Sequence, residues 1–110
     1  MNDTACRRIV RVRSGGVCEV CGQARATSQH HRRKVGRVSV PSNVLDTCGD
    51  GTTGCHGRIE ANPDWARASG WWVDSTEDPA ATPVVLAAWP GWRVLLDDEG
   101  LIVPFHGDRI

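Results

Sequence analysis

The sequence contains no run of apolar residues long enough to cross a membrane. Residues 1–17 lack the apolar stretch of a secretory signal peptide and carry four arginines instead. Without an export signal, a cytoplasmic protein is expected, and there cysteines at metal-ligand spacing favour zinc over disulfide bonds. No internal repeat or low-complexity segment is visible.

The formal net charge is zero, because thirteen basic residues balance thirteen acidic ones. The balance hides an asymmetry, because residues 1–58 hold ten basic and four acidic residues, whereas residues 59–110 hold three and nine. A basic half suits a polyanionic partner such as DNA. A charged surface that only contacts solvent explains the same asymmetry.

A chain of 110 residues predicts a single domain, residues 1–110, with a small core that benefits from an internal cross-link. Residues 3–14 predict a helix that Asp3 or Thr4 caps and that Gly15 ends. Cys6 falls on the apolar face of this helix and is expected to pack as a small hydrophobic residue.

The middle of the chain predicts short elements. Residues 27–33 are expected to be extended and residues 43–45 to form a brief extended or turn segment. Residues 56–61 predict a short helix, and a second helix is expected from Pro63 to Ala68, because proline suits the first helical position.

The last third is apolar and predicts β structure. Candidate strands are residues 70–73, 83–86, 92–96 and 101–105, with a hairpin turn at 97–100. All five tryptophans lie between residues 65 and 92, which indicates core packing more than a platform for stacked bases.

Four of the five cysteines have the spacing of a zinc site. Cys18-x2-Cys21 forms one pair, and Cys48-x6-Cys55 forms a wider pair whose intervening glycines allow a tight turn. Zinc bound by four cysteines has no open coordination position, so the predicted Zn2+ would stabilise the fold and do no chemistry.

Several polar residues remain beside these cysteines. His56 and Glu60 stand four residues apart on the predicted helix and therefore share a face. Two other interpretations stay open: His56 could replace Cys48 as a zinc ligand, and Glu60 could be a solvated helix residue. Asn43 could likewise be only a turn residue.

The combination of these motifs resembles the HNH endonucleases, in particular the zinc-stapled branch common among small phage-encoded proteins. The resemblance rests on Gln29-His30-His31-Arg32-Arg33, Asn43-Val44-Leu45 and Cys48…Gly54-Cys55-His56-Gly57, preceded by Cys18-x2-Cys21. It implies an α+β fold with a ββα-metal core at about residues 15–69, followed by a small C-terminal β region at about 70–110.

The resemblance also implies roles for individual residues. His30, His56 and Glu60 would bind a catalytic divalent ion, Mg2+ or a similar one, and His31 would be the general base. Asn43 would brace the backbone that carries the base. Hydrolysis of a phosphodiester needs such a base and such a cation. The residues expected to bind DNA phosphates are Arg32, Arg33, Lys34 and Arg37.

The predicted function is therefore that of a metal-dependent HNH endonuclease acting on DNA, with no membrane partner. The resemblance suggests a phage protein that works in the host cytoplasm beside DNA-packaging proteins. One alternative is a non-catalytic, zinc-stapled nucleic-acid-binding module, which would have no reason to carry the histidine set. Another is a structural protein that docks partners through its tryptophan-rich part.

Overall fold

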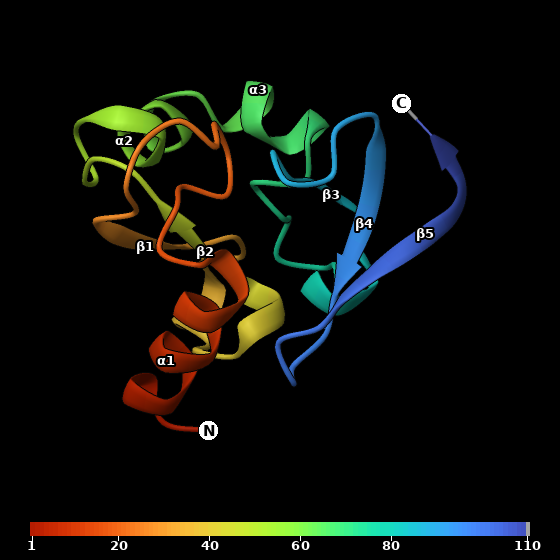
Figure 1. Ribbon diagram of the computed structural model, residues 1–110, viewed down its shortest axis with the longest axis horizontal. Helices are drawn as coiled ribbons and strands as arrows, with labels where there is room; N and C mark the ends of the chain where they lie inside the picture. The colour runs from red at the N-terminus through yellow and green to blue at the C-terminus, as the bar shows by residue number, and fades with distance from the viewer. Residues whose placement is uncertain (110) are drawn as a thin grey trace.

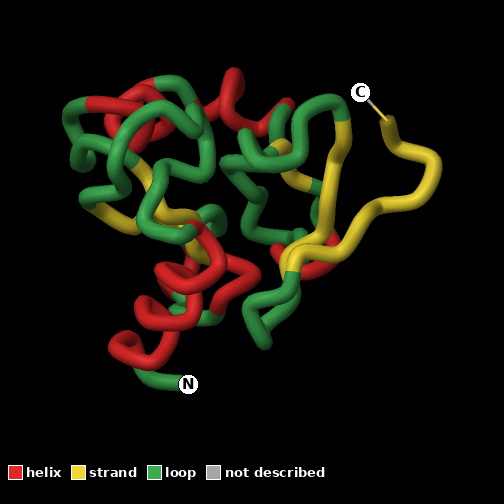
Figure 2. Tube along the Cα trace, in the orientation of Figure 1, coloured by secondary structure: helices red, strands yellow, loops and turns green. Residues whose placement is uncertain are grey.

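The chain folds into short helices and two small antiparallel sheets (Figures 1 and 2). The computed structural model describes the backbone of residues 1–109 and the side chains of residues 1–105. The helices are α1 (Asp3–Ser14), α2 (Gly54–Ala61) and α3 (Pro63–Ala68), with 3₁₀ turns at Val35–Arg37, Pro41–Asn43 and Pro79–Ala81. The strands are β1 (Ser28–His31), β2 (Val44–Thr47), β3 (Val84–Val85), β4 (Trp92–Leu96) and β5 (Ile102–Arg109). The predicted mixture of helix and sheet is confirmed.

The first sheet pairs β1 with β2 and leaves the other edge of β1 free. Its register places His30 opposite Leu45 and His31 opposite Val44. Helix α2 packs against both strands, and α1 packs against β2 (Figure 1). Because both faces are covered, every residue of β2 is buried.

Helix α1 has the predicted bounds but a different cap. The side chain of Asn2, rather than Asp3 or Thr4, accepts a hydrogen bond from the backbone N–H of Ala5 at 2.8 Å. Gly15 ends the helix in the left-handed conformation, as expected. Cys6 is buried against the sheet, which confirms its predicted role in the core.

A buried ion pair fixes α1 to the rest of the chain. The Arg13 guanidinium donates to both carboxylate oxygens of Glu19 and to the carbonyls of Pro41 and Val44. Glu19 also accepts a hydrogen bond from the backbone N–H of Asp46. One cation thereby joins α1, the loop before β1 and strand β2.

The main core lies between the two sheets and the helices α2 and α3. The second sheet has the order β3-β4-β5, and its β4–β5 hairpin has the predicted turn at residues 97–100. The buried core residues are Leu45, Ile59, Ala66, Trp71, Val84, Leu86, Val94 and Leu96. Among the helices that the structure describes, none combines the length and apolar character that a membrane span requires.

The predicted strand at residues 70–73 is wrong. Gly70 has a positive φ, and the N–H of Trp71 bonds the Ala66 carbonyl, so this segment completes the end of α3. Trp71 then turns its indole into the core, where Nε1 donates to the Val85 carbonyl. Within this segment, Val73 forms one isolated β-bridge, with Arg33.

Arg32 is a structural residue, which corrects its predicted role in binding phosphates. Its side chain is fully buried and donates to four backbone carbonyls: Gly70 and Ser42 at 2.8 Å, Thr82 at 2.9 Å and Pro79 at 3.0 Å. Burial lowers the pKa of Arg32 to about 9, so the guanidinium stays protonated at neutral pH. It joins the loops that surround it and offers no surface to DNA.

Replacing Arg32 should therefore destabilise the protein strongly. We expect Arg32→Met to lower the free energy of unfolding by on the order of 3 kcal/mol or more, because buried carbonyls lose their donor. Arg33→Met is the matched control, since the Arg33 side chain bonds only the exposed carbonyl of Ser75. Urea denaturation measures both variants, and equal losses of stability would contradict the assigned role of Arg32.

Candidate metal centres

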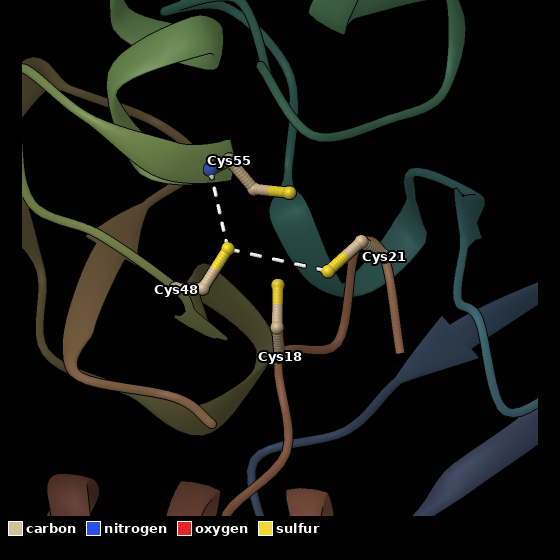
Figure 3. Close-up of side chains that lie close together, drawn as sticks. All are labelled: Cys18, Cys21, Cys48 and Cys55. Carbon is tan, nitrogen blue, oxygen red and sulfur yellow. Dashed lines mark hydrogen bonds between the residues drawn. The ribbon is translucent and has the colours of Figure 1, made fainter. Parts of the chain in front are cut away.

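The four predicted cysteines converge (Figure 3). Cys18 and Cys21 lie in the loop before β1, Cys48 follows β2, and Cys55 lies in the first turn of α2. All four sulfurs lie within 4.8 Å of one another, and the Sγ atoms of Cys21 and Cys48 are 4.0 Å apart. Tetrahedral zinc with Zn–S bonds of about 2.3 Å requires sulfurs about 3.8 Å apart. The cluster can hold a metal ion such as zinc.

The surrounding backbone supports this arrangement. The N–H of Gln23 points at the sulfur of Cys21, and the N–H of Cys55 points at that of Cys48. The wide link between Cys48 and Cys55 closes because Gly49 has a positive φ and because a side chain there would collide with the Thr53 carbonyl.

The pKa values of the thiols suit a site that an ion completes. Burial raises the pKa of Cys18 and of Cys55. Hydrogen bonds lower the pKa of Cys21 to about 7, and the largest contribution comes from the backbone N–H of Gln23. Zinc binding would release protons from the buried thiols, because the thiolate is the form that binds the metal.

A second cluster combines His30 of β1 with His56 and Glu60 of α2. Glu60 Oε1 lies 3.2 Å from His30 Nδ1 and 3.4 Å from His56 Nε2. The structure therefore groups His56 with Glu60, and the four cysteines form their own cluster without it. Glu60 is partly buried and paired, which removes its interpretation as a merely solvated helix residue.

The tautomer of His30 is fixed by a backbone carbonyl. Nε2 lies 2.6 Å from the carbonyl oxygen of Trp71, so Nε2 carries the proton, and the lone pair on Nδ1 can accept from the Lys34 ammonium at 3.3 Å. Burial, followed by the charge of Lys34, lowers the pKa of His30 to about 4. His30 is thus neutral at neutral pH, the form that binds a metal.

His56 is oriented by a hydroxyl group. Ser28 Oγ lies 2.7 Å from His56 Nδ1 and 2.8 Å from the Gly49 carbonyl, so a hydrogen bond at Nδ1 holds the ring in place. The other ring nitrogen, Nε2, faces Glu60 at 3.4 Å. Burial also lowers the pKa of His56. Both imidazoles have the outer hydrogen bonds that typically orient metal ligands.

Lys34, which the sequence predicts to contact a phosphate, lies at the centre of this cluster. Its Nζ atom donates to Glu60 Oε1 and lies 3.3 Å from His30 Nδ1 and 5.3 Å from the centre of the Trp72 ring. Burial raises the pKa of Glu60, but the hydrogen bond and charge of Lys34 outweigh this effect and lower it overall. The ammonium group of Lys34 thus lies between the carboxylate of Glu60 and the imidazole of His30.

His31 lines a cleft beside this cluster. The cleft has a volume of about 400 Å³ and is lined by Gln29, His31, Lys34, Arg37, Gly51, His56 and Glu60. Ser39 Oγ donates to Asp3 at 2.8 Å and lies 3.2 Å from His31 Nε2, so it accepts the Nε2 proton. The lone pair of His31 is then on Nδ1. Burial and the charge of Arg37 lower the pKa of His31, which keeps the ring neutral.

Asn43 is buried and holds the backbone that follows β1. Its side chain accepts from the N–H of Arg33 at 2.8 Å and donates to the carbonyls of Arg33 and Val38.

Of the four predicted phosphate contacts, Arg37 alone is exposed in the cleft, while the Arg33 guanidinium bonds the Ser75 carbonyl.

Comparison with protein-family models, with curated proteins and with solved structures found no match, so function must be inferred from these two clusters themselves. Sequence reasoning missed the groups that orient the histidines. Every residue has a backbone carbonyl, so the sequence does not show that the carbonyl of Trp71 contacts a histidine. Ser28 and Ser39 belong to no recognisable motif.

The cysteine cluster predicts one tightly bound zinc per chain. Cys21→Ser should lose both the zinc and the native fold, because a structural metal contributes its binding energy to folding. Metal analysis and circular dichroism of the purified protein measure these two effects. Cys6→Ser is the control and should keep its zinc, whereas a wild-type protein that folds without any metal would contradict the assignment.

The position of Lys34 predicts competition with a divalent ion. Lys34→Met should raise the affinity of the zinc-loaded protein for Mn2+ by about tenfold to a hundredfold, because a hydrogen bond to a charged group contributes about 1.5–3 kcal/mol. Isothermal titration calorimetry measures this affinity.

Arg37→Met removes the same charge from the same cleft without touching Glu60, so it controls for long-range repulsion. Weaker Mn2+ binding by Lys34→Met than by Arg37→Met would show that the ammonium supports the site instead of competing for it.

Proposed function

We propose that the protein is a metal-dependent HNH endonuclease that hydrolyses phosphodiester bonds in DNA. The observation that carries this proposal is the convergence of His30, His56 and Glu60 in one cluster, two members of which, His56 and Glu60, line the same cleft as His31. Strands β1 and β2 and helix α2 have the order and packing expected of a ββα-metal core. The cysteine cluster stands apart from them as a structural site.

The residues that would hold the catalytic ion are His30 through Nδ1, His56 through Nε2, and Glu60 through its carboxylate. Mg2+ or a similar ion, when bound, supplies positive charge for the phosphate and the leaving oxygen. Lys34 moves aside in this state. Its ammonium then lies free beside the same cleft, where a phosphate is an alternative partner.

His31 is suited to act as the general base. It is neutral, and its lone pair on Nδ1 can accept a proton from water. The hydrogen bond to Ser39, which Asp3 in turn accepts, holds the ring in this tautomer. Asn43 fixes the chain immediately after β1 and so limits movement of the base.

The remaining features follow from the resemblance. Arg37 would contact a phosphate in the cleft without reading sequence. Cleavage would leave a 5′-phosphate and a 3′-hydroxyl. A phage protein that acts in the host cytoplasm beside DNA-packaging proteins is the setting that the analogy favours.

A second candidate is a zinc-stapled module that binds nucleic acid without cleaving it. The contact between Lys34 and Glu60 favours this reading, because the pair balances its own charge and needs no second metal. The grouping of two imidazoles with the carboxylate of Glu60 favours the nuclease, since the Lys34–Glu60 ion pair does not require both histidines.

Supercoiled-plasmid nicking distinguishes these candidates. Zinc-loaded wild-type protein should nick the plasmid when Mg2+ or Mn2+ is added. His31→Ala should keep zinc, fold and DNA affinity but lose activity by a factor on the order of 10²–10⁴, the usual contribution of a general base.

His56→Ala should instead weaken binding of the added ion, so that a higher Mn2+ concentration partly restores its activity. His56 is a better choice than His30, whose removal would also leave the buried Trp71 carbonyl without a donor. A folded, zinc-loaded wild type that binds DNA but does not nick it with Mg2+, Mn2+, Ni2+ or Zn2+ would defeat the nuclease proposal.

A further inference from the structure

A second groove borders β1, as the candidate active-site cleft does. It lies between α1 and β1, has a volume of about 520 Å³, and is lined by Arg7, Arg8, Arg11, Thr27, Ser28 and Gln29. Gln29 lines both the groove and the cleft. The two hollows therefore border the same residue of β1, two positions before His31.

The combined lining is strongly basic. It contains five cationic side chains and a single carboxylate, that of Glu60. The acidic neighbours of α1 add little repulsion, because Asp46 is fully buried beneath Arg11 and Asp3 is paired with Arg7. Arg8 is exposed and forms no ion pair with any residue that the structure describes.

The helix that carries these arginines is held in place. Arg11 Nε donates to Asp46 at 2.7 Å, and Ser14 donates to the same carboxylate at 2.6 Å. Gln29 donates both to Asp46 and to the backbone carbonyl of Arg7. The exposed arginines therefore keep a fixed position relative to His31, unlike charges on a mobile tail.

We propose that α1 is a DNA-backbone binding element, in which Arg7 and Arg8 contact the phosphates that flank the one in the cleft. The proposal rests on the function proposed above, because it takes DNA as the partner. Guanidinium groups bind phosphate oxygens through charge-assisted hydrogen bonds, which position a strand without reading its sequence. A basic surface beside the cleft would also explain why the basic residues of the chain are concentrated in residues 1–58.

The salt dependence of DNA binding tests this assignment. Each phosphate contact that is lost should lower the slope of log affinity against log salt concentration by about 0.9. Arg7→Ala/Arg8→Ala should therefore lower the slope by about 1.8 and weaken binding to unrelated sequences alike. Fluorescence anisotropy with a short labelled duplex, in zinc-loaded protein without added Mg2+, measures this without cleavage.

Arg7 and Arg8 are exposed, and alanine favours helix, so this variant should fold. Arg11 is left unchanged, because its removal would leave the buried Asp46 without its ion pair. Arg25→Ala/Arg67→Ala removes the same charge from exposed positions that line neither hollow, and its slope should stay close to the wild-type value.

The possible outcomes separate this inference from the proposed function. DNA binding with an unchanged slope in Arg7→Ala/Arg8→Ala would overturn the role of α1 and leave the nuclease intact. Equal slope changes in both double variants would also overturn it, since net charge alone would then explain the effect. A wild type that does not bind DNA would defeat the proposed function, and this inference with it.

Discussion

The convergence of four cysteine sulfurs is the constraint on which the rest of the site depends. It joins the loop before β1 to the first turn of α2, two segments separated by the whole β1–β2 hairpin. Because His56 directly follows Cys55, holding that sulfur also places the imidazole against Ser28 and opposite His30. One structural cluster thereby fixes the geometry of the second. A chain with so small a core gains most from this kind of cross-link.

Buried cations supply the other cross-links. Arg13 and Arg32 each donate to several groups from different loops and strands, and both are almost completely buried. This use of arginine explains why a count of basic residues overstates the basic surface that is exposed. The two side chains satisfy carbonyls that the short strands and irregular loops leave unpaired, which suits a protein with little regular sheet.

The sequence predicted the features that depend on local spacing. The helix at residues 3–14, the hairpin at 92–105 and the cysteine cluster follow from caps, turns and ligand intervals, and the structure has them. The positions of Arg32 and Lys34 could not be predicted, because a run of basic residues does not show which of its members turns inward. The strand predicted at residues 70–73 was wrong for a similar reason. Its aromatic residues suit a strand, but its backbone completes the end of helix α3.

Lys34 gives the second cluster two possible states. With the ammonium on Glu60, the cluster is a neutralised, partly buried ion pair; with a divalent ion, the same three groups become a metal site. The convergence of two imidazoles on one carboxylate is the feature that favours the second state. Anomalous X-ray diffraction from zinc-loaded crystals soaked in Mn2+ tests this most directly. The account predicts a zinc peak among the four cysteines and a separate Mn2+ peak bound by His30, His56 and Glu60, with Lys34 displaced. A single zinc peak, with Lys34 still on Glu60 at saturating Mn2+, would contradict it.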